Sequence, residues 1–427
     1  MQIIKTQPKP SEIELTIEVA PEEYKPYLEK AAVRISKNIK IEGFRPGKAP
    51  YNIVKQKVGE MDIYQEALDD IVSYFYWRAV DQEKLDTVGQ PKIDLEKLAP
   101  ENPISFKATV GLMPQVKIGE YKNIKVKKEQ VKINDEEVSK VINDIRKMQA
   151  KEALADRPAK LADRVEIDFS VSLDKVVIDG GQEKKYPLVL GDGMMIPGFE
   201  EQVEGMKKDE EKEFQLKFPA VYQNKMLAGK LCDFKVKLLS VYNRELPELN
   251  DDWAKTVGAE SVEDLRSKIR KNLKDEKMLH EEQRVEIEML KKITDQAQIS
   301  EIPEVLIHTE AHRMIHEFED SIANQGIQFD DYLKSIKKEN KDLEAEFEPK
   351  AIERVKTSLV IKQIAEAEKI EATAEDITKE TARILEQVKD NQEALNNIES
   401  EGYQHYIKTV VRNRKVIEML KSQIIGG

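Results

Sequence analysis

The 142 residues from Glu260 to Glu401 contain one glycine, Gly326, and two prolines, Pro303 and Pro349. Glycine and proline are the residues that most often end helices, and the rest of this stretch is rich in good helix formers. The apolar positions do not hold a strict heptad for long, and no repeat of fixed length is present. The stretch therefore predicts several long helices that pack together and form protruding hairpins, rather than a coiled coil or a solenoid.

Local signals indicate where some of these helices begin. Ser261 is followed three residues later by Asp264, and Thr373 by Asp376, the pattern of a side chain that caps a helix. Pro303 stands where a helix begins. Further apolar residues have helical spacing: Leu333, Ile336, Leu343, Phe347, Ile352, Val355, Leu359, Ile361 and Ile364. Such faces either pack inside the helical region or hold unfolded chains by many weak contacts, and the sequence does not separate the two.

Residues 1–112 combine strand and helix patterns. Apolar residues alternate from Ile13 to Val19, which predicts a strand with one buried face. A helical run follows from Pro21 to Ile35, and a second covers Met61 to Asp81. Alternation returns from Ile104 to Val110. We expect a mixed α and β domain here.

The next two segments differ in pattern. Residues 113–153 predict an extended stretch and then a helix that is capped by Asn134 with Glu137 and runs to about Ala153. Residues 158–243 hold 7 of the 18 glycines and show three runs of strand alternation, which predicts a small, mostly β domain.

Charge is unevenly distributed along the 427 residues. Residues 244–427 carry 29 Lys and Arg against 40 Asp and Glu, so bulk attraction to nucleic acid is not expected there. Residues 25–58 carry nine basic and two acidic side chains, and this window is the expected polyanion-facing surface. No apolar run has the length of a membrane helix, no export signal is present and Cys232 is the single cysteine, so we expect a cytoplasmic protein.

Residues 43–50 read Gly-Phe-Arg-Pro-Gly-Lys-Ala-Pro and lie inside the basic window. Two glycines and two prolines predict a rigid turn between helices. The turn would display Phe44, Arg45 and Lys48, one aromatic anchor and two cations suited to a ribonucleoprotein surface. The alternative is a simple helix–helix turn with Phe44 tucked into the core.

Residues 188–201 read Leu-Val-Leu-Gly-Asp-Gly-Met-Met-Ile-Pro-Gly-Phe-Glu-Glu. Gly191 and Gly193 alone are a weak phosphate-loop signal without the context of a dinucleotide fold, so no nucleotide site is expected. The longer string resembles the core of FKBP-type peptidyl-prolyl isomerases. Matched position by position, that resemblance implies a catalytic pocket of Phe169, Ile178, Asp179, Ile196, Phe199, Tyr222 and Phe234. Ile178 departs from the aromatic residue of most active relatives, and Val171 replaces a usual glycine.

Such a pocket needs no nucleophile. Rotation about the X–Pro bond is slow because amide resonance imposes a barrier of about 20 kcal/mol. A twisted amide has lost its charge separation, so an apolar aromatic pocket favours it over the planar ground state. Tyr222 would hold a substrate carbonyl. The alternative is that these aromatic residues only fill the core of a small β domain.

His308, His312 and His316 are spaced to share one helix face, as in two-histidine zinc sites. The metalloprotease pattern requires a glutamate directly after the first histidine, where Thr309 stands. We therefore interpret these histidines as solvated residues of a helix face and expect no metal.

The whole chain resembles the trigger factors, bacterial ribosome-associated chaperones, through the turn at residues 43–50, the isomerase string and the sequence Glu-Leu-Pro-Glu-Leu at 245–249. The resemblance implies a multidomain α+β protein. Its expected parts are a ribosome-binding domain (1–112), a linker packing on the C-terminal body (113–153), an FKBP-type domain (154–243) and an all-α substrate-cradle domain with arms (244–427).

The same resemblance implies the partners. Phe44, Arg45 and Lys48 would contact protein and rRNA of the large ribosomal subunit near the nascent-chain exit. Nascent polypeptides would bind without ATP or another cofactor, the protein would form a homodimer off the ribosome, and a link to cell division is implied. Two alternatives remain: a freestanding isomerase whose helices only dimerise it, and a structural adaptor that binds no unfolded chains.

Overall fold

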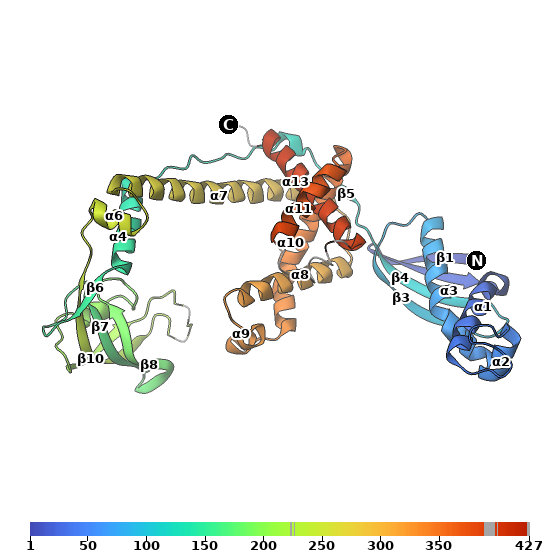
Figure 1. The fold of residues 1–427 in the computed structure, drawn as a ribbon, viewed down its shortest axis with the longest axis horizontal. Coiled ribbons are helices and arrows are strands. Elements are labelled where there is room, and N and C mark those ends of the chain that lie inside the picture. The colour runs from blue at the N-terminus through green and yellow to red at the C-terminus, as the bar shows by residue number, and fades with distance from the viewer. Residues whose placement is uncertain (223, 226, 388–397, 399, 425–427) are drawn as a thin grey trace. The chain divides into compact units, whose positions relative to one another are not determined.

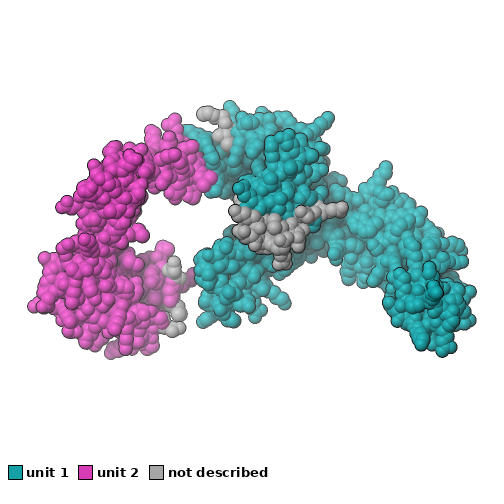
Figure 2. All heavy atoms as spheres, in the orientation of Figure 1, with its two compact units in different colours: residues 1–128, 282–427 teal, residues 129–281 magenta. Residues whose placement is uncertain are grey.

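The computed structural model describes residues 1–222, 224–225, 227–387, 398 and 400–424 (Figure 1). The chain divides into two compact units (Figure 2). The first unit consists of residues 1–128 together with residues 282–427, and the second unit consists of residues 129–281. The second unit is thus an insertion into the first. No helix among the described residues is long and apolar enough to cross a membrane.

The first part of the chain forms an antiparallel sheet and three helices. Its elements are β1 (Gln2–Lys9), β2 (Glu12–Val19), α1 (Pro21–Asn38), α2 (Tyr51–Val58), α3 (Glu60–Gln82), β3 (Thr87–Lys97) and β4 (Ile104–Leu112). The strand order is β1-β2-β4-β3. The alternating residues of β2 and β4 share one buried cluster with α1 and α3, which lie on the same side of the sheet (Figure 1). The predicted strands and helices are present, and β1, α2 and β3 are additional.

The connector leads into the inserted unit. Its elements are β5 (Val116–Lys117), the 3₁₀ turn η1 (Tyr121–Asn123) and α4 (Asp135–Met148). The Asn134 side chain accepts a hydrogen bond from the Glu137 N–H at 2.8 Å, the predicted cap. The expectation that this helix reaches about Ala153 is wrong, because residues 151–154 form strand β6 and pair with β10.

The glycine-rich region forms a five-stranded antiparallel sheet with one short helix. Its elements are β6 (Lys151–Leu154), β7 (Arg164–Leu173), β8 (Val176–Val189), α5 (Phe199–Val203), β9 (Glu211–Lys217) and β10 (Leu231–Glu245). Strand β10 is central, because it pairs with β7 along one edge and with β9 and β6 along the other. Phe199 and Val203 of α5 pack in one cluster with buried residues of β7 and β10, which fixes the helix on the sheet.

The last part of the chain is helical, as predicted. Its elements are α6 (Asp251–Thr256), α7 (Val262–Gln296), the short strand β11 (Gln298–Ile299), α8 (Glu304–Ala323), α9 (Phe329–Ile336), α10 (Asn340–Ala367), α11 (Ala374–Gln387) and α13 (Glu401–Ile424). The side chains of Ser261 and Thr373 accept the N–H groups of Asp264 and Asp376 at 3.2 and 3.3 Å, the predicted caps. Helix α10 continues through Pro349.

The connector packs against this helical region within the first unit. Tyr121, Ile124 and Val126 share a buried cluster with residues of α7, α10 and α13. The Val126 N–H donates to the Ile424 carbonyl at 3.4 Å, near the end of the chain. The core of the helical body is therefore completed by an extended segment from far earlier in the sequence.

Candidate functional site

The turn at residues 43–50 is anchored at both ends. Ile41 and Ala49 are buried in the core of the first domain. The Gly47 N–H donates to the Ser36 carbonyl of α1 at 3.0 Å, and the Lys48 N–H donates to the Arg45 carbonyl at 3.0 Å. Gly47 has a φ of +75°, and a Cβ there would come within 2.8 Å of the Lys37 side chain, so both conformation and space require glycine.

The side chains of this turn face solvent. Phe44 is 41% exposed, which shows that the alternative of a ring tucked into the core is wrong. Arg45 and Lys48 are also exposed. Elsewhere in the basic window Arg34 contacts Glu66 and Asp70, and Lys55 contacts Glu60, whereas no ion pair to a described residue engages Arg45 or Lys48. The turn thus presents one aromatic ring and two available cations on a fixed backbone.

Aromatic side chains gather where α5 crosses the sheet of the inserted unit. The Phe199 ring lies 6.3 Å from Phe169 and 5.6 Å from Phe234, both nearly edge-on. Phe234 and Phe214 are register partners on β10 and β9, and their rings stack at 5.7 Å. The structure thus brings together three of the predicted pocket residues, Phe169, Phe199 and Phe234.

Burial divides the predicted pocket residues into two groups. Phe199 is 0% exposed and Phe234 is 2% exposed, so neither ring offers surface to a substrate in this arrangement. Phe169, Ile178 and Ile196 are half-buried and pack against the same cluster. The accessible apolar surface therefore comes from these three residues, and the two phenylalanines support it from below.

Tyr222 lies at the edge of this group. It is 38% exposed, and its ring contacts Phe218 at 4.8 Å, while Phe218 in turn stacks on Phe234 at 6.0 Å. Asp179 belongs to strand β8, and its side chain lies outside the described part of the structure. Tyr222 thus joins the buried rings through Phe218, at their exposed edge.

Three further aromatic residues belong to this cluster and are absent from the pocket that the sequence predicts. Phe214 and Phe218 both stack on Phe234. Tyr186 of β8 meets the Phe169 ring edge-on at 5.5 Å. Phe214 could be identified from its register opposite Phe234, which requires the strand pairing, whereas Tyr186 and Phe218 are identified only by their ring contacts.

The structure shows which residues surround Val171 and Ile178, the two departures from the isomerase pattern. Val171 is 4% exposed and is the register partner of Phe234, so it fills space beside that ring. Ile178 lies against Gly181, where a Cβ would come within 2.2 Å of the isoleucine side chain. The missing side chain of Gly181 therefore leaves the space that Ile178 occupies, and a larger residue at position 178 would have to fit into the same space.

The helical region shows which of its apolar residues are packed. Of the nine with helical spacing, Leu333, Leu343, Val355, Leu359, Ile361 and Ile364 are buried, and Ile336, Phe347 and Ile352 are half-buried. The exposed large apolar side chains of residues 262–424 that the structure describes are others: Met278, Leu279, Ile287, Val305, Ile327 and Tyr406. The predicted faces thus form the core of the helices, and a different, scattered set faces solvent.

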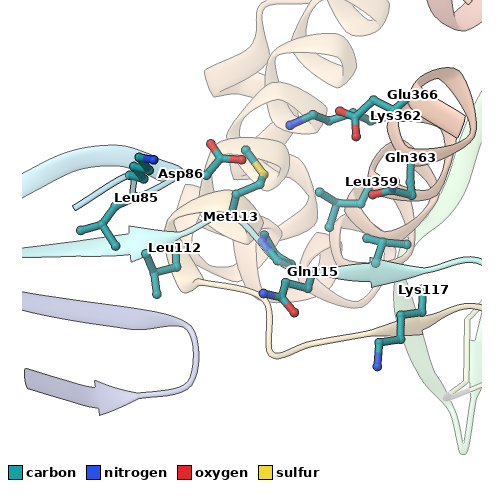
Figure 3. A pocket seen from close by; sticks show the side chains of 13 residues that line it. Leu85, Asp86, Leu112, Met113, Gln115, Lys117, Leu359, Lys362, Gln363 and Glu366 are labelled. Carbon is teal, nitrogen blue, oxygen red and sulfur yellow. The ribbon is translucent and has the colours of Figure 1, made fainter. Parts of the chain in front are cut away.

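A pocket of about 610 Å³ opens within the first unit (Figure 3). It is lined by Lys84, Leu85, Asp86, residues 112–117, Leu359, Lys362, Gln363 and Glu366. Figure 3 shows Met113 on the strand side and Leu359 on α10, with Lys362 and Glu366 further along that helix. Its lining combines apolar side chains with lysines and carboxylates.

The three histidines of α8 are exposed and face glutamates. His308 Nδ1 lies 2.8 Å from Glu344 of α10, which lowers the pKa of that carboxyl, and His312 lies 3.7 Å from the same group. His316 instead faces Glu319 at 3.3 Å. Among the described residues no group of three or more His, Cys, Asp or Glu side chains is arranged to hold a metal ion.

Comparisons with known proteins cover all three regions. The family model described as bacterial trigger factor protein matches residues 1–145, and the trigger factor C-terminus matches residues 261–422. The FKBP-type peptidyl-prolyl cis-trans isomerase model matches residues 155–239.

Relatives extend over nearly the full chain. The trigger factor of Ligilactobacillus salivarius (strain UCC118) is 36% identical over 411 residues, 96% of this chain and 94% of the relative. That of Staphylococcus aureus (strain Newman) is 37% identical over 413 residues, 95% of this chain and 94% of the relative. A solved structure of a trigger factor chaperone aligns over 99% of this chain and 100% of its own, with 21% identity and a TM-score of 0.45.

These parts define a ribosome-associated chaperone that carries an FKBP-type peptidyl-prolyl isomerase domain. A freestanding isomerase is not favoured, because the similarity continues through the regions on both sides of that domain. The chain belongs to the trigger factor family.

Proposed function

We propose that the protein docks on the large ribosomal subunit near the nascent-chain exit, holds emerging polypeptides without ATP and isomerises their X–Pro bonds. The observation that carries this proposal is the turn at residues 43–50. Phe44, Arg45 and Lys48 are exposed together, while Gly47 and the buried neighbours Ile41 and Ala49 fix the backbone beneath them.

The chemistry of the turn suits a surface of RNA and protein. Two cations without described partners can contact phosphates or acidic side chains, and release of counterions then makes the affinity depend on salt. The Phe44 ring adds apolar contact that salt does not weaken. A rigid turn loses little conformational entropy on binding, so more of the contact energy appears as affinity.

For the isomerase step, the substrate would contact Phe169, Ile178 and Ile196, the half-buried residues of the aromatic cluster. These side chains present apolar surface without hydrogen-bonding groups, which favours the less polar twisted amide over the planar one. Tyr222, which is 38% exposed, can donate a hydrogen bond to a substrate carbonyl. Asp179 stays a prediction from the resemblance.

For client binding, the scattered exposed apolar residues of the helices supply weak contacts, and the pocket of Figure 3 supplies a recess beside Met113 and Leu359. Many weak sites allow one surface to hold unrelated sequences. The net negative charge of residues 244–427 keeps a loaded complex soluble. A homodimer off the ribosome, a cytoplasmic location and a link to cell division stay predictions from the resemblance.

Co-sedimentation of the full-length protein with ribosomes at 50 and 200 mM salt tests the docking. We expect pelleting with ribosomes that weakens as the salt rises. A freestanding isomerase would stay in the supernatant at both salt concentrations. A separate assay measures aggregation of a denatured client, which a structural adaptor would fail to delay. Isomerase activity is measured separately on a proline-containing peptide.

A further inference from the structure

The loop between β8 and α5 carries a pocket residue but has no regular structure. It spans residues 190–198 and includes Ile196. Three of its glycines have positive φ: Gly191 at +96°, Gly193 at +68° and Gly198 at +90°. Glycine-rich backbone has many accessible conformations, so something outside the loop must select this one.

One carboxylate gathers the backbone of this loop. Glu200, on the first turn of α5, is 8% exposed. Its Oε2 accepts the N–H of Gly191 at 2.6 Å and of Gly193 at 3.3 Å. Its Oε1 accepts the N–H of Met194 at 3.0 Å and of Met195 at 3.5 Å. Each oxygen thus takes two donors, and hydrogen bonds to an ionised acceptor are stronger than neutral ones.

The hydrogen bonds to Glu200 also restrict the part of the loop that carries Ile196, one of the residues proposed to face the substrate. Met195 and Ile196 pack against the cluster that contains Phe199 and Phe234. The Phe199 N–H donates to the Ile196 carbonyl at 3.1 Å, so Ile196 is fixed from both sides of the Pro197-Gly198 turn. A displacement of the Met195 backbone would move Ile196 relative to Phe169.

We propose that Glu200 is a positioning residue for the isomerase pocket: its buried carboxylate sets the conformation of residues 191–195 and thereby the place of Ile196 in the wall. The proposal rests on the proposed isomerase function. Glu200 does not touch the substrate. It acts by satisfying four backbone donors that water would otherwise contact in a looser, more variable loop.

The Glu200→Gln variant isolates this role. Glutamine has nearly the same shape but one acceptor oxygen, so its NH₂ group would face two of the four backbone N–H groups. Glu201→Gln is the matched control, because it removes the same charge from the next residue of the same helix, whose side chain is exposed. Glu200→Asp keeps the carboxylate but retracts it by one methylene, so it should fall between the wild type and Glu200→Gln.

The experiment measures two quantities on the full-length protein. In a peptide isomerisation assay, kcat should fall about tenfold in Glu200→Gln, equivalent to about 1.4 kcal/mol, with KM changed less than about twofold. In hydrogen–deuterium exchange, the amides of residues 191–195 should exchange faster, while amides of β7 and β10 keep their rates. Glu201→Gln should match the wild type in both.

The outcomes separate this proposal from the isomerase function. If the wild type is active and Glu200→Gln retains its kcat, the positioning role is refuted while the isomerase function stands. If β7 and β10 also exchange faster, Glu200 has a general structural role and the proposal is likewise refuted. If the wild type has no activity, the isomerase function fails, and unchanged exchange of residues 191–195 in Glu200→Gln would then also refute the loop constraint.

Discussion

Replacing Phe44, Arg45 and Lys48 together by alanine should abolish most ribosome binding without unfolding the protein. The three side chains are exposed, and the backbone is held by Ile41, Gly47 and Ala49, which the variant keeps. We therefore expect an unchanged melting temperature. The turn should be present in the variant but should lack the groups that make contact.

The structure gives the size of the effect. Phe44 exposes 41% of its surface, and complete burial of a phenylalanine contributes about 1.5–3 kcal/mol, so covering this part contributes about 1 kcal/mol. Two exposed cations contribute about 0.5–1 kcal/mol each. The sum, about 2–3 kcal/mol, corresponds to a loss of affinity of about 30- to 150-fold.

The salt dependence is a second, independent number. If both cations contact phosphates, affinity should fall about tenfold between 50 and 200 mM salt, and the triple variant should lose this dependence.

Titration of ribosomes in a sedimentation assay measures both quantities. The matched control replaces Trp77, Lys84 and Lys97, one exposed aromatic residue and two exposed lysines of the same domain. An unchanged affinity of the Phe44, Arg45 and Lys48 variant, or an equal loss in the control, would refute the docking assignment.

Three further predictions concern the other regions. Phe199→Ala should lower the free energy of unfolding of the isomerase domain by about 3–5 kcal/mol, because its ring is fully buried; a chemical denaturation midpoint equal to that of the wild type would contradict this. Burial alone would raise the pKa of Asp163, but hydrogen bonds from Arg157 and the Lys160 N–H hold it below its usual value. The ionised Asp163 therefore stabilises the folded domain above about pH 4, and this contribution is lost as the pH falls further. Asp163→Asn should lower the free energy of unfolding at pH 7 by about 2 kcal/mol. A plot of that free energy against pH should also become flatter on its acid side. Removal of residues 154–243 should leave client holding intact in an aggregation assay, because the exposed apolar residues of the helices lie outside the removed domain. The cut ends can be rejoined, since Glu152 and Arg244 beside them are register partners. Complete loss of holding would place the client surface in the removed domain.

Features determined by neighbouring residues could be predicted from the sequence. The alternation from Ile13 to Val19 gives β2, and Asn134 with Glu137 gives the cap of α4, because each pattern acts within a few residues. Strand β1 was missed because it is a polar edge strand, with mainly exposed residues such as Gln7 and Lys9. The end of α4 was misplaced because pairing of β6 with β10 depends on residues about 90 positions later.

The candidate site divides in the same way. The turn and isomerase strings are local and could be recognised, but depth of burial is set by packing, so Phe199 and Phe234 were expected to face a substrate and instead lie beneath the surface. Glu200 and Glu201 are equivalent in the sequence. Only the fold shows that one carboxylate turns inward to four backbone donors while the other is exposed.

The segment from Tyr121 to Val126 has a consequence for the protein's own synthesis. Its apolar residues are covered by helices of which the last, α13, ends at Ile424. About 300 residues must be added after Val126 before this partner exists, which takes about 15–60 s at bacterial elongation rates. During that interval Tyr121, Ile124 and Val126 lack the cover that α13 gives them, so each new copy presents uncovered apolar side chains to the copies already made.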